Sequence, residues 1–340
     1  METGADLESL AAWMTAQDLG SGPIEQVVRL AGGTQNILLR FRRDGRDYVL
    51  RRPPAHPRAN SNETMRREAR LLRALAGSDV PYPALIAGCD DETVLGAAFY
   101  LMEPVDGFNP VGALPEPHAS SAEIQHGMGL ALVDGIAALG RIDWRAAGLE
   151  DFGKPDNFLG RQVTRWRSQL ASYADFAGWP GPQSLPAVDR VGDWLERHRP
   201  AAFAPGIMHG DYHLANVMFR HDGPELAAIV DWELATIGDP LLDLGWLLAT
   251  WPDGDGASAV SVTPWIGFPK ADELVARYRA GSDRDLSAVG WYHVLACFKL
   301  GILLEGTHAR ACAGQASRDV GDRLHGRAVA LLERAGRLTR

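Results

Sequence analysis

Lysine is scarce in this sequence, which contains only Lys154, Lys270 and Lys299 among 340 residues. Lysine and arginine together number 34, against 43 aspartates and glutamates, so the formal net charge is -9. No strongly basic block offsets this charge, and contact with nucleic-acid phosphates needs a basic surface. We therefore expect no nucleic-acid partner.

Cysteine is rare as well, and its spacing does not suggest a disulfide framework. The sequence has Cys89, Cys297 and Cys312, an odd number without C-x-x-C spacing. This pattern is typical of free, buried thiols in a reducing compartment. We also expect no metal site built from histidine and cysteine side chains.

Targeting signals and long apolar runs are also missing. The first 20 residues are acidic and lack the basic start and apolar centre of a signal peptide. The nearest approach to a membrane span, residues 288–306, is interrupted by His293 and Lys299, so it is expected to be a buried helix. With 46% hydrophobic and 23% charged residues, we expect a globular, soluble, cytoplasmic protein without a membrane partner. The oligomeric state is left open.

The segments that are present fall into two parts with different periodicity. In the first part, short strands alternate with turns such as Asp44-Gly45, and one helix is expected over residues 62–77. The expected strands cover residues 24–30, 37–41, 47–52, 84–89 and 97–105. The expected helices of the second part cover residues 120–139, 158–176, 187–198, 241–250, 270–280, 284–305 and 316–337. The pattern predicts an α+β protein with a β-rich lobe, residues 1–104, and a larger helical lobe, residues 105–340.

Polar residues between apolar flanks mark the stretch HGDYHLANVMF, residues 209–219. Asp211 and Asn216 stand five residues apart, as in a kinase catalytic loop, where the Asp receives a hydroxyl proton and the Asn holds a metal ion. This spacing alone is expected about once by chance in such a chain, but the preceding His-Gly makes it specific. Asp231 ends the apolar segment ELAAIVD and can supply a second metal ligand. Such oxygen ligands suit Mg²⁺.

Together, HGDYHLANVMF and IVDWE make the sequence resemble the aminoglycoside phosphotransferase family of kinase-like enzymes over nearly the whole chain. The segments YVLRRPP, RREARLLRALAG and FYLMEPVDG look most like the branch related to the kinase-like domain of acyl-CoA dehydrogenase fusion proteins. The resemblance implies a two-lobed protein-kinase-like fold. It also implies a Mg²⁺-dependent transfer of the γ-phosphate of ATP or GTP to a hydroxyl group of a small molecule.

The resemblance further implies a glycine-rich loop above the phosphates and a hinge beside the adenine. Missing side chains and free amides let such a loop approach phosphates closely, although a plain hairpin turn would look similar. The residues at the loop position are Gly33, Thr34, Gln35 and Asn36. At the hinge, the backbone of Glu103 and Val105 is expected to meet the adenine edge.

No lysine precedes the hinge, so another cation must hold the phosphates. In DYVLRR, the two-residue period of a strand places Arg51 and Val49 on one face and Arg52 and Leu50 on the other. The register of the motif puts Arg51 in the cleft, where its guanidinium can reach two phosphate oxygens. By resemblance, Glu68 is the acid that pairs with it. Arg52 is expected to be a surface charge.

Residues around the catalytic loop are expected to support it. We expect His209 to brace the loop by a hydrogen bond, His213 to be a bystander, and Asp239 and Asp243 to hold the loop backbone. Gly210 replaces the arginine that protein kinases have after this histidine. Control by an arginine-docked phosphorylated activation loop is therefore not expected.

The acceptor is left open by the sequence. A hydroxyacyl metabolite is favoured over an aminoglycoside-type antibiotic because of the branch resemblance, and a pseudokinase without activity is disfavoured because Asp211, Asn216 and Asp231 are all present. Tryptophans of the second lobe could line a partly apolar acceptor pocket or belong to the core. They are Trp166, Trp179, Trp251, Trp265 and Trp291.

Overall fold

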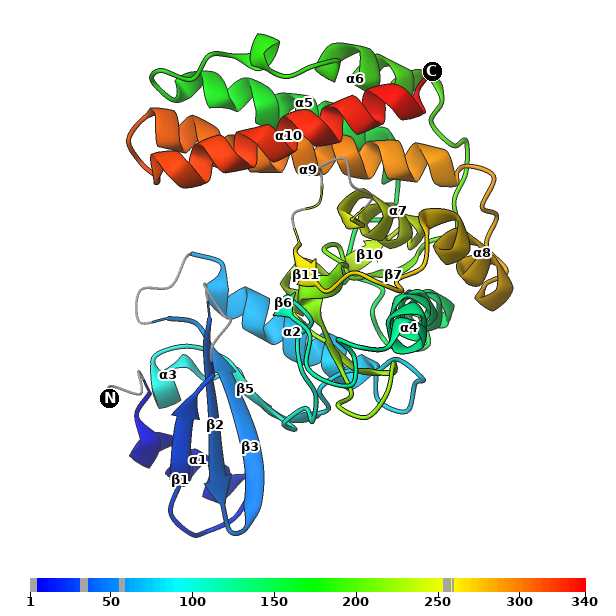
Figure 1. Cartoon of the computed structure of the whole chain (residues 1–340). Coiled ribbons are helices and arrows are strands. Elements are labelled where there is room, and N and C mark those ends of the chain that lie inside the picture. The colour runs from blue at the N-terminus through cyan, green and yellow to red at the C-terminus, as the bar shows by residue number, and fades with distance from the viewer. Residues whose placement is uncertain (1–4, 31–35, 55–58, 253–257, 259) are drawn as a thin grey trace.

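The computed structural model describes residues 5–30, 36–54, 59–252, 258 and 260–340. A β-sheet lies at one end of the molecule and a layer of long helices lies at the other (Figure 1). The sheet has five antiparallel strands in the order β1-β2-β3-β5-β4. The strands are β1 (Glu25–Arg29), β2 (Ile37–Arg43), β3 (Arg46–Arg52), β4 (Leu85–Cys89) and β5 (Phe99–Met102). All five expected strands are therefore present.

The turn between β2 and β3 follows from its two residues. Asp44 and Gly45 have φ values of 47° and 79°, which is the conformation required in a two-residue hairpin turn that matches the strand twist. Arg43 and Arg46 pair directly on either side of the turn, and Leu38 pairs with Arg51 further along the strands. The turn therefore fixes the register that sets which face carries Arg51.

One face of the sheet is covered by a helix that we did not expect from the sequence. Helix α1 (Leu7–Ala16) begins after Asp6, whose carboxylate accepts hydrogen bonds from the backbone of Glu8 and Ser9. Its Leu10 and Met14 are buried together with the inward side chains of the sheet. Those inward side chains include Leu39, Phe41, Leu50 and Phe99. The short helix α3 (Glu92–Leu95) packs beside α1.

Helix α2 (Ser61–Ala74) lies between the sheet and the helical lobe (Figure 1). Its Leu71 and Leu72 are buried in the same core as residues of the second lobe. Arg67 donates hydrogen bonds to the carbonyl oxygens of Phe152 and Ala235, at 2.8 and 3.3 Å. The helix is thus anchored to the helical lobe, which fixes the position of the side chains that it presents to the sheet.

The second lobe contains the helices that the sequence predicts. They are α4 (Ala122–Arg141), α5 (Gln162–Ala171), α6 (Val188–Arg197), α7 (Leu241–Thr250), α8 (Ala271–Gly281), α9 (Val289–Cys312) and α10 (Arg318–Leu338). Helices α5, α6, α9 and α10 form the layer farthest from the sheet (Figure 1). The apolar stretch of α9 is a buried core helix, and none of the described helices is both long enough and apolar enough to cross a membrane.

Short paired strands carry the polar loop of the second lobe. Strand β7 (Gly206–Met208) pairs with β10 (Thr236–Gly238), and β8 (Val217–Phe219) pairs with β9 (Leu226–Ile229), both antiparallel. A smaller pair joins β6 (Gly112–Ala113) to β11 (Val262–Thr263). The loop between β7 and β8 holds residues 209–216, and Asp231 follows β9 closely. These two strand pairs bring the polar segments together, and the backbone N–H of Val230 donates to the carbonyl oxygen of Asn216 at 2.9 Å.

Candidate active site

The loop after β7 begins with a close backbone contact between Gly210 and Leu234. Gly210 has a φ of 87°, and a Cβ atom there would lie 2.5 Å from the carbonyl oxygen of Leu234. Only glycine fits this position without strain. The carboxylate of Asp243, in the first turn of α7, accepts the backbone N–H groups of His209 and Gly210 at 2.6 and 2.9 Å. Burial raises the pKa of Asp243 to about 7, although these hydrogen bonds oppose the rise.

His209 connects the loop to the segment that precedes Asp231. Its Nε2 lies 2.9 Å from the carbonyl oxygen of Val230, and its Nδ1 accepts the backbone N–H of Asp211 at 3.3 Å. This geometry requires a proton on Nε2 and none on Nδ1. The ring is fully buried, and burial lowers its pKa. His209 is therefore hydrogen-bonded as a brace, as expected, with both ring nitrogens occupied.

Asp211 is surrounded by hydrogen-bond donors. Nδ2 of Asn216 donates to its backbone oxygen at 2.9 Å and to Oδ2 at 3.0 Å, and the indole Nε1 of Trp246 donates to Oδ1 at 2.8 Å. Nε2 of His213 lies 3.3 Å from the same Oδ1, so His213 contacts Asp211 directly. Burial would raise the pKa of Asp211, but His213, His209 and Trp246 outweigh it and lower the pKa to about 2. The carboxylate is thus ionised at neutral pH.

A second cluster joins the sheet, α2 and the segment after β9. Nε of Arg51 lies 2.9 Å from Oε2 of Glu68, and Nη2 lies 2.9 Å from Oδ1 of Asp231. The hydroxyl of Tyr100 donates to Oε2 of Glu68 at 2.7 Å. Burial would lower the pKa of Arg51, but its acidic neighbours outweigh that effect and raise the pKa, so the guanidinium remains charged. Asp231, with a φ of 65° and a side chain 42% exposed, faces solvent on its other side.

Arg52 corrects our expectation of a surface charge. It lies on the opposite face of β3 from Arg51, as the strand period indicates, but only 7% of the residue is exposed. Its Nε donates to the carbonyl oxygen of Pro53 at 3.2 Å, and burial lowers its pKa. The expectation was wrong because Arg52 lies on the face of β3 that also carries Tyr48 and Leu50, and this face is buried in the core of the sheet.

The expected nucleotide-binding segments are only partly described. Gly33, Thr34 and Gln35 lie outside the described residues, and Asn36 is half-buried immediately before β2. The backbone N–H of Glu103 donates to the carbonyl oxygen of Ala84 at 2.9 Å. The carbonyl oxygen of Glu103 is therefore the backbone group of this residue that could bond the adenine edge. The Glu103 carboxylate forms an ion pair with Arg46. Val105 is half-buried next to it.

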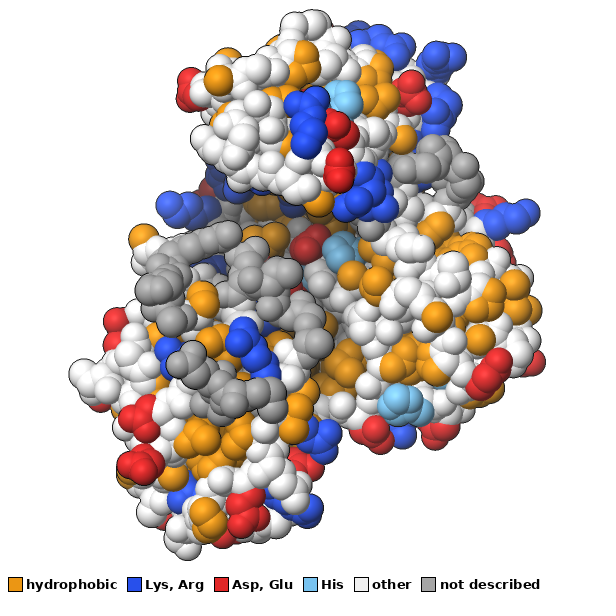
Figure 2. All heavy atoms as spheres, turned by 60° about the vertical axis from the view of Figure 1, so that its left-hand side comes forward, with side chains coloured by type: hydrophobic (Ala, Val, Ile, Leu, Met, Phe, Trp, Pro, Cys, Tyr) orange, Lys and Arg blue, Asp and Glu red, His pale blue; other side chains and the backbone are white. Residues whose placement is uncertain are grey.

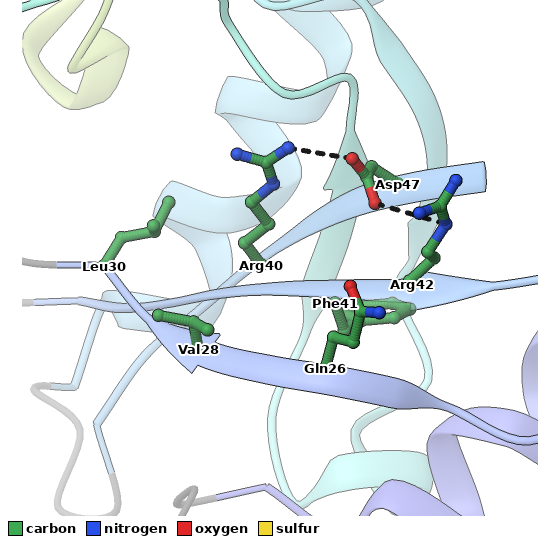
Figure 3. Close-up of a pocket in the computed structure, with 7 residues that line it drawn as sticks. All are labelled: Gln26, Val28, Leu30, Arg40, Phe41, Arg42 and Asp47. Carbon is green, nitrogen blue, oxygen red and sulfur yellow. Dashed lines mark hydrogen bonds and ion pairs between the residues drawn. The ribbon is translucent and has the colours of Figure 1, made fainter. Parts of the chain in front are cut away.

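A surface hollow of about 390 Å³ is lined by residues of β1, β2 and β3 (Figure 3). It lies on the sheet face that carries Arg51, as the strand pairing shows. Directly paired residues share a face, so the pairing of Leu38 with Arg51 and of Arg40 with Val49 places all four on this side. The residues that line the hollow are Gln26, Val28, Leu30, Arg40, Phe41, Arg42 and Asp47. Seen from another side, the molecule is also hollowed between its lobes, where acidic and histidine side chains are visible (Figure 2).

Lys299 and Trp246 touch the catalytic loop, and we did not single them out from the sequence. Nζ of Lys299, on α9, lies 3.3 Å from the carbonyl oxygen of Gly210 and 4.3 Å from the centre of the Trp246 ring. Burial lowers the pKa of Lys299 to about 8, although Asp211 and Asp243 oppose the change. The scarcity of lysine was the only sequence feature that could have drawn attention to Lys299.

The expectation that tryptophans line an acceptor pocket is not supported for most of them. Trp166, Trp251 and Trp291 are buried in the core of the second lobe. The indole N–H groups of Trp251 and Trp291 donate to the backbone oxygens of Pro269 and Leu195. The indole N–H of Trp166 is buried without a hydrogen-bond partner among the described residues. Burial in the core indicates that these three side chains stabilise the lobe.

The fold and the site together define a kinase-like phosphotransferase. The features typical of this class are a five-stranded sheet with a buried Arg–Glu pair, a helical lobe, and an Asp–Asn loop followed by a second aspartate. The chain belongs to the phosphotransferase enzyme family APH, whose family model matches residues 26–289.

Among curated relatives, acyl-CoA dehydrogenase family member 10 of Mus musculus is 29% identical, over 87% of this chain and 27% of that protein. Acyl-CoA dehydrogenase family member 11 of Rattus norvegicus is 28% identical, over 92% of this chain and 41% of that protein. The chain thus spans less than half the length of these two relatives.

Solved structures show the same fold. A Ralstonia eutropha JMP134 protein assigned to the aminoglycoside phosphotransferases is 31% identical, with a TM-score of 0.81 over 98% of this chain and 99% of that chain. A thermostable mutant of aminoglycoside phosphotransferase APH(4)-Ia, in a ternary complex with AMP-PNP and hygromycin B, is 15% identical. Its TM-score is 0.59 over 96% of this chain and 99% of that chain.

Proposed function

We propose that this protein is a Mg²⁺-dependent kinase that transfers the γ-phosphate of ATP or GTP to a hydroxyl group of a small molecule. The observation that carries the proposal is the ionised Asp211, held by Asn216 and Trp246 in the loop that follows β7. This aspartate can orient the acceptor hydroxyl and take its proton. With a pKa of about 2 it is a weak base, so its proton transfer should come late, when the oxygen–phosphorus bond is already forming.

The nucleotide would lie against the sheet face that carries Arg51. The guanidinium bonds both Glu68 and Asp231, so a bound phosphate would compete with Asp231 for Nη2 while Glu68 keeps Nε in place. The carbonyl oxygen of Glu103 and the backbone of Val105 are proposed to meet the adenine edge. Gly33, Thr34, Gln35 and Asn36 are proposed to cover the phosphates.

Asn216 and Asp231 fit a magnesium ion by their chemistry. The amide nitrogen of Asn216 is used on Asp211, which leaves its oxygen as a possible ligand, and Asp231 is half-exposed with one oxygen on Arg51. Mg²⁺ prefers such oxygen ligands and keeps several waters. When bound, it would neutralise charge on the nucleotide phosphates. The residues of this chain would hold the nucleotide and orient the hydroxyl.

For the acceptor, we favour a hydroxyacyl metabolite, because two curated relatives are acyl-CoA dehydrogenase family members. The alternative is an aminoglycoside-type antibiotic, which the similarity to the Ralstonia eutropha protein favours. A pseudokinase is disfavoured because Asp211, Asn216 and Asp231 are all present, Asn216 bonds the Asp211 carboxylate, and Val230, directly before Asp231, donates its backbone N–H to the carbonyl oxygen of Asn216. The burial of Trp166, Trp251 and Trp291 removes one argument for an apolar acceptor pocket.

A thermal-shift screen tests the donor first. ATP or GTP with Mg²⁺ should raise Tm, since a ligand that binds only the folded state stabilises it. A hydroxyl-acceptor panel with the better nucleotide should then show saturable phosphorylation of hydroxyacyl compounds. Phosphorylation of kanamycin-type sugars at micromolar concentration, with none on hydroxyacyl compounds, would reverse our order of acceptors. If neither nucleotide raises Tm in the presence of any divalent metal ion, the kinase proposal is rejected.

Asp231→Asn should weaken the Mg²⁺ requirement and nucleotide affinity together. The amide keeps the size of the side chain but removes the negative charge that a divalent cation needs. We expect the nucleotide Tm shift in saturating Mg²⁺ to fall to less than about half of the wild-type shift. Asp283→Asn, which changes an exposed aspartate between α8 and α9, is the control and should leave the shift intact. An unchanged Mg²⁺ titration for Asp231→Asn would remove Asp231 from the metal site.

Lys299→Met should lower kcat roughly tenfold, because it removes a positive charge next to the loop that carries Asp211. The lysine loses its proton as pH rises through about 8, so wild-type kcat should fall above that pH. The Met variant should lack this alkaline limb. Lys154→Met, an exposed lysine, is the matched control. A kcat profile of the Met variant that keeps the wild-type alkaline limb would show that Lys299 does not cause it.

A further inference from the structure

The hairpin of α9 and α10 brings together metal-ligating side chains outside the candidate active site. Glu305, His308 and Cys312 stand at positions i, i+3 and i+7 of α9, so they share one helix face. Asp322 and His325 stand at positions i and i+3 of α10. The two helices pack along their length. His308 lies nine residues beyond Lys299, about 14 Å further along the helix axis.

The donor atoms of this cluster lie close to one another. Single ligand atoms of Glu305, His308 and His325 all fall within 4.8 Å. Nε2 of His308 is 3.6 Å from Sγ of Cys312, and Nδ1 of His325 is 2.7 Å from Oε2 of Glu305. The two imidazole rings are stacked with centroids 4.5 Å apart. This arrangement corrects our expectation that histidine and cysteine would form no cluster, because the fold joins two segments that the sequence separates.

The surroundings resemble the outer shell of a metal site. Two ligands of a tetrahedral zinc ion with ordinary Zn–N and Zn–S bonds are separated by about 3.5 Å, which matches the distance between His308 and Cys312. Nδ1 of His308 is buried and makes no hydrogen bond to the described residues, but Oδ1 of Asp322 lies 3.4 Å away. A carboxylate at the second ring nitrogen is the usual support of a metal-bound histidine. The indole N–H of Trp179 holds Oε1 of Glu305 at 2.7 Å.

We propose that Glu305, His308, Cys312 and His325 bind one divalent transition-metal ion of the zinc class. Nitrogen, sulfur and carboxylate ligands favour zinc over magnesium or calcium. Glu305 is fully buried and His308 is 5% exposed, whereas the His325 side chain is 26% exposed. Four protein ligands would leave no open position on the ion, so the site would be structural. The ion would join α9 to α10. This site is independent of the kinase proposal.

The test uses the full-length chain without a histidine tag, stripped with EDTA and dialysed against ZnCl₂ in excess Mg²⁺. Elemental analysis should give one zinc per chain. His308→Gln and His325→Gln should each weaken zinc binding by at least about 100-fold, since loss of even a supporting residue costs 10- to 100-fold. Cobalt(II) should give a thiolate charge-transfer band in the wild type, and Cys312→Ser should lose this band.

Control variants distinguish zinc bound at this cluster from zinc bound elsewhere on the chain. His198→Gln changes an exposed histidine that directly follows α6 and should bind zinc like the wild type. The Asp231→Asn variant should also retain the zinc. Loss of zinc binding by this variant would place the ion in the active site and overturn the proposal. Circular dichroism checks that each variant is folded. Absence of stoichiometric zinc from the wild type, or full retention in a folded His308→Gln/His325→Gln variant, would show that the cluster is a hydrogen-bond network only.

Discussion

Asp211→Asn is expected to lower turnover by roughly 10² to 10⁴, with nucleotide binding close to that of the wild type. The amide keeps the shape of the side chain but has only one oxygen, so it can accept from Trp246 or from Asn216 but not from both. It removes the carboxylate that we propose takes the proton of the acceptor hydroxyl. Steady-state kinetics on a verified acceptor and a nucleotide thermal-shift titration measure the two effects separately.

Asp243→Asn is the informative comparison for this variant. Asp243 holds the backbone of the same loop from α7 but accepts only N–H groups of His209 and Gly210. Its replacement should lower thermal stability and reduce turnover less than Asp211→Asn does. Wild-type turnover for Asp211→Asn would show that another group accepts the proton.

Arg51→Ala is expected to raise the nucleotide KM strongly and lower kcat/KM by the equivalent of roughly 2 to 4 kcal/mol. The guanidinium is the buried cation that joins Glu68 on α2 to Asp231 after β9. Its loss leaves Glu68 without a charged partner and removes the phosphate-binding fork. The measurement is the nucleotide dependence of the steady-state rate at saturating Mg²⁺.

Two neighbouring substitutions test why Arg51 matters. Arg51→Lys should retain only part of kcat/KM, because a point charge replaces a two-pronged donor. Arg52→Ala should leave the kinetic constants within about twofold but lower Tm, since this side chain is buried on the other face of β3. If Arg52→Ala were instead the variant that loses kcat/KM, the assignment of Arg51 to the cleft would be wrong.

Local patterns predicted most of the helices and the strands of the sheet. Residues 241–250 were expected as a helix, and α7 spans Leu241–Thr250. Asp44 and Gly45 fixed the hairpin because only a few residue types tolerate their backbone angles. Helix α1 was missed, although Leu10 and Met14 are spaced four residues apart after a capping Asp6. The division of the chain near residue 104 stays a prediction.

Contacts between segments that are distant in the chain could not be predicted from local sequence patterns. The strand period placed Arg51 and Arg52 on opposite faces, but it could not show that the face of Arg52 is buried as well. Trp246 and Lys299 reach Asp211 and Gly210 from α7 and α9, and no local spacing connects them.

By itself, the sequence determined the family resemblance and the candidate catalytic loop, because Asp211, Asn216 and Asp231 follow one another within 21 residues of one chain segment. The tertiary structure alone decided the ionised state of Asp211 and the burial of Arg52. It also brought His308 and His325 together from two helices. The physical reason is that pKa values and metal ligation depend on which atoms surround a group in space. Periodicity reports only which side of its own helix or strand a residue occupies.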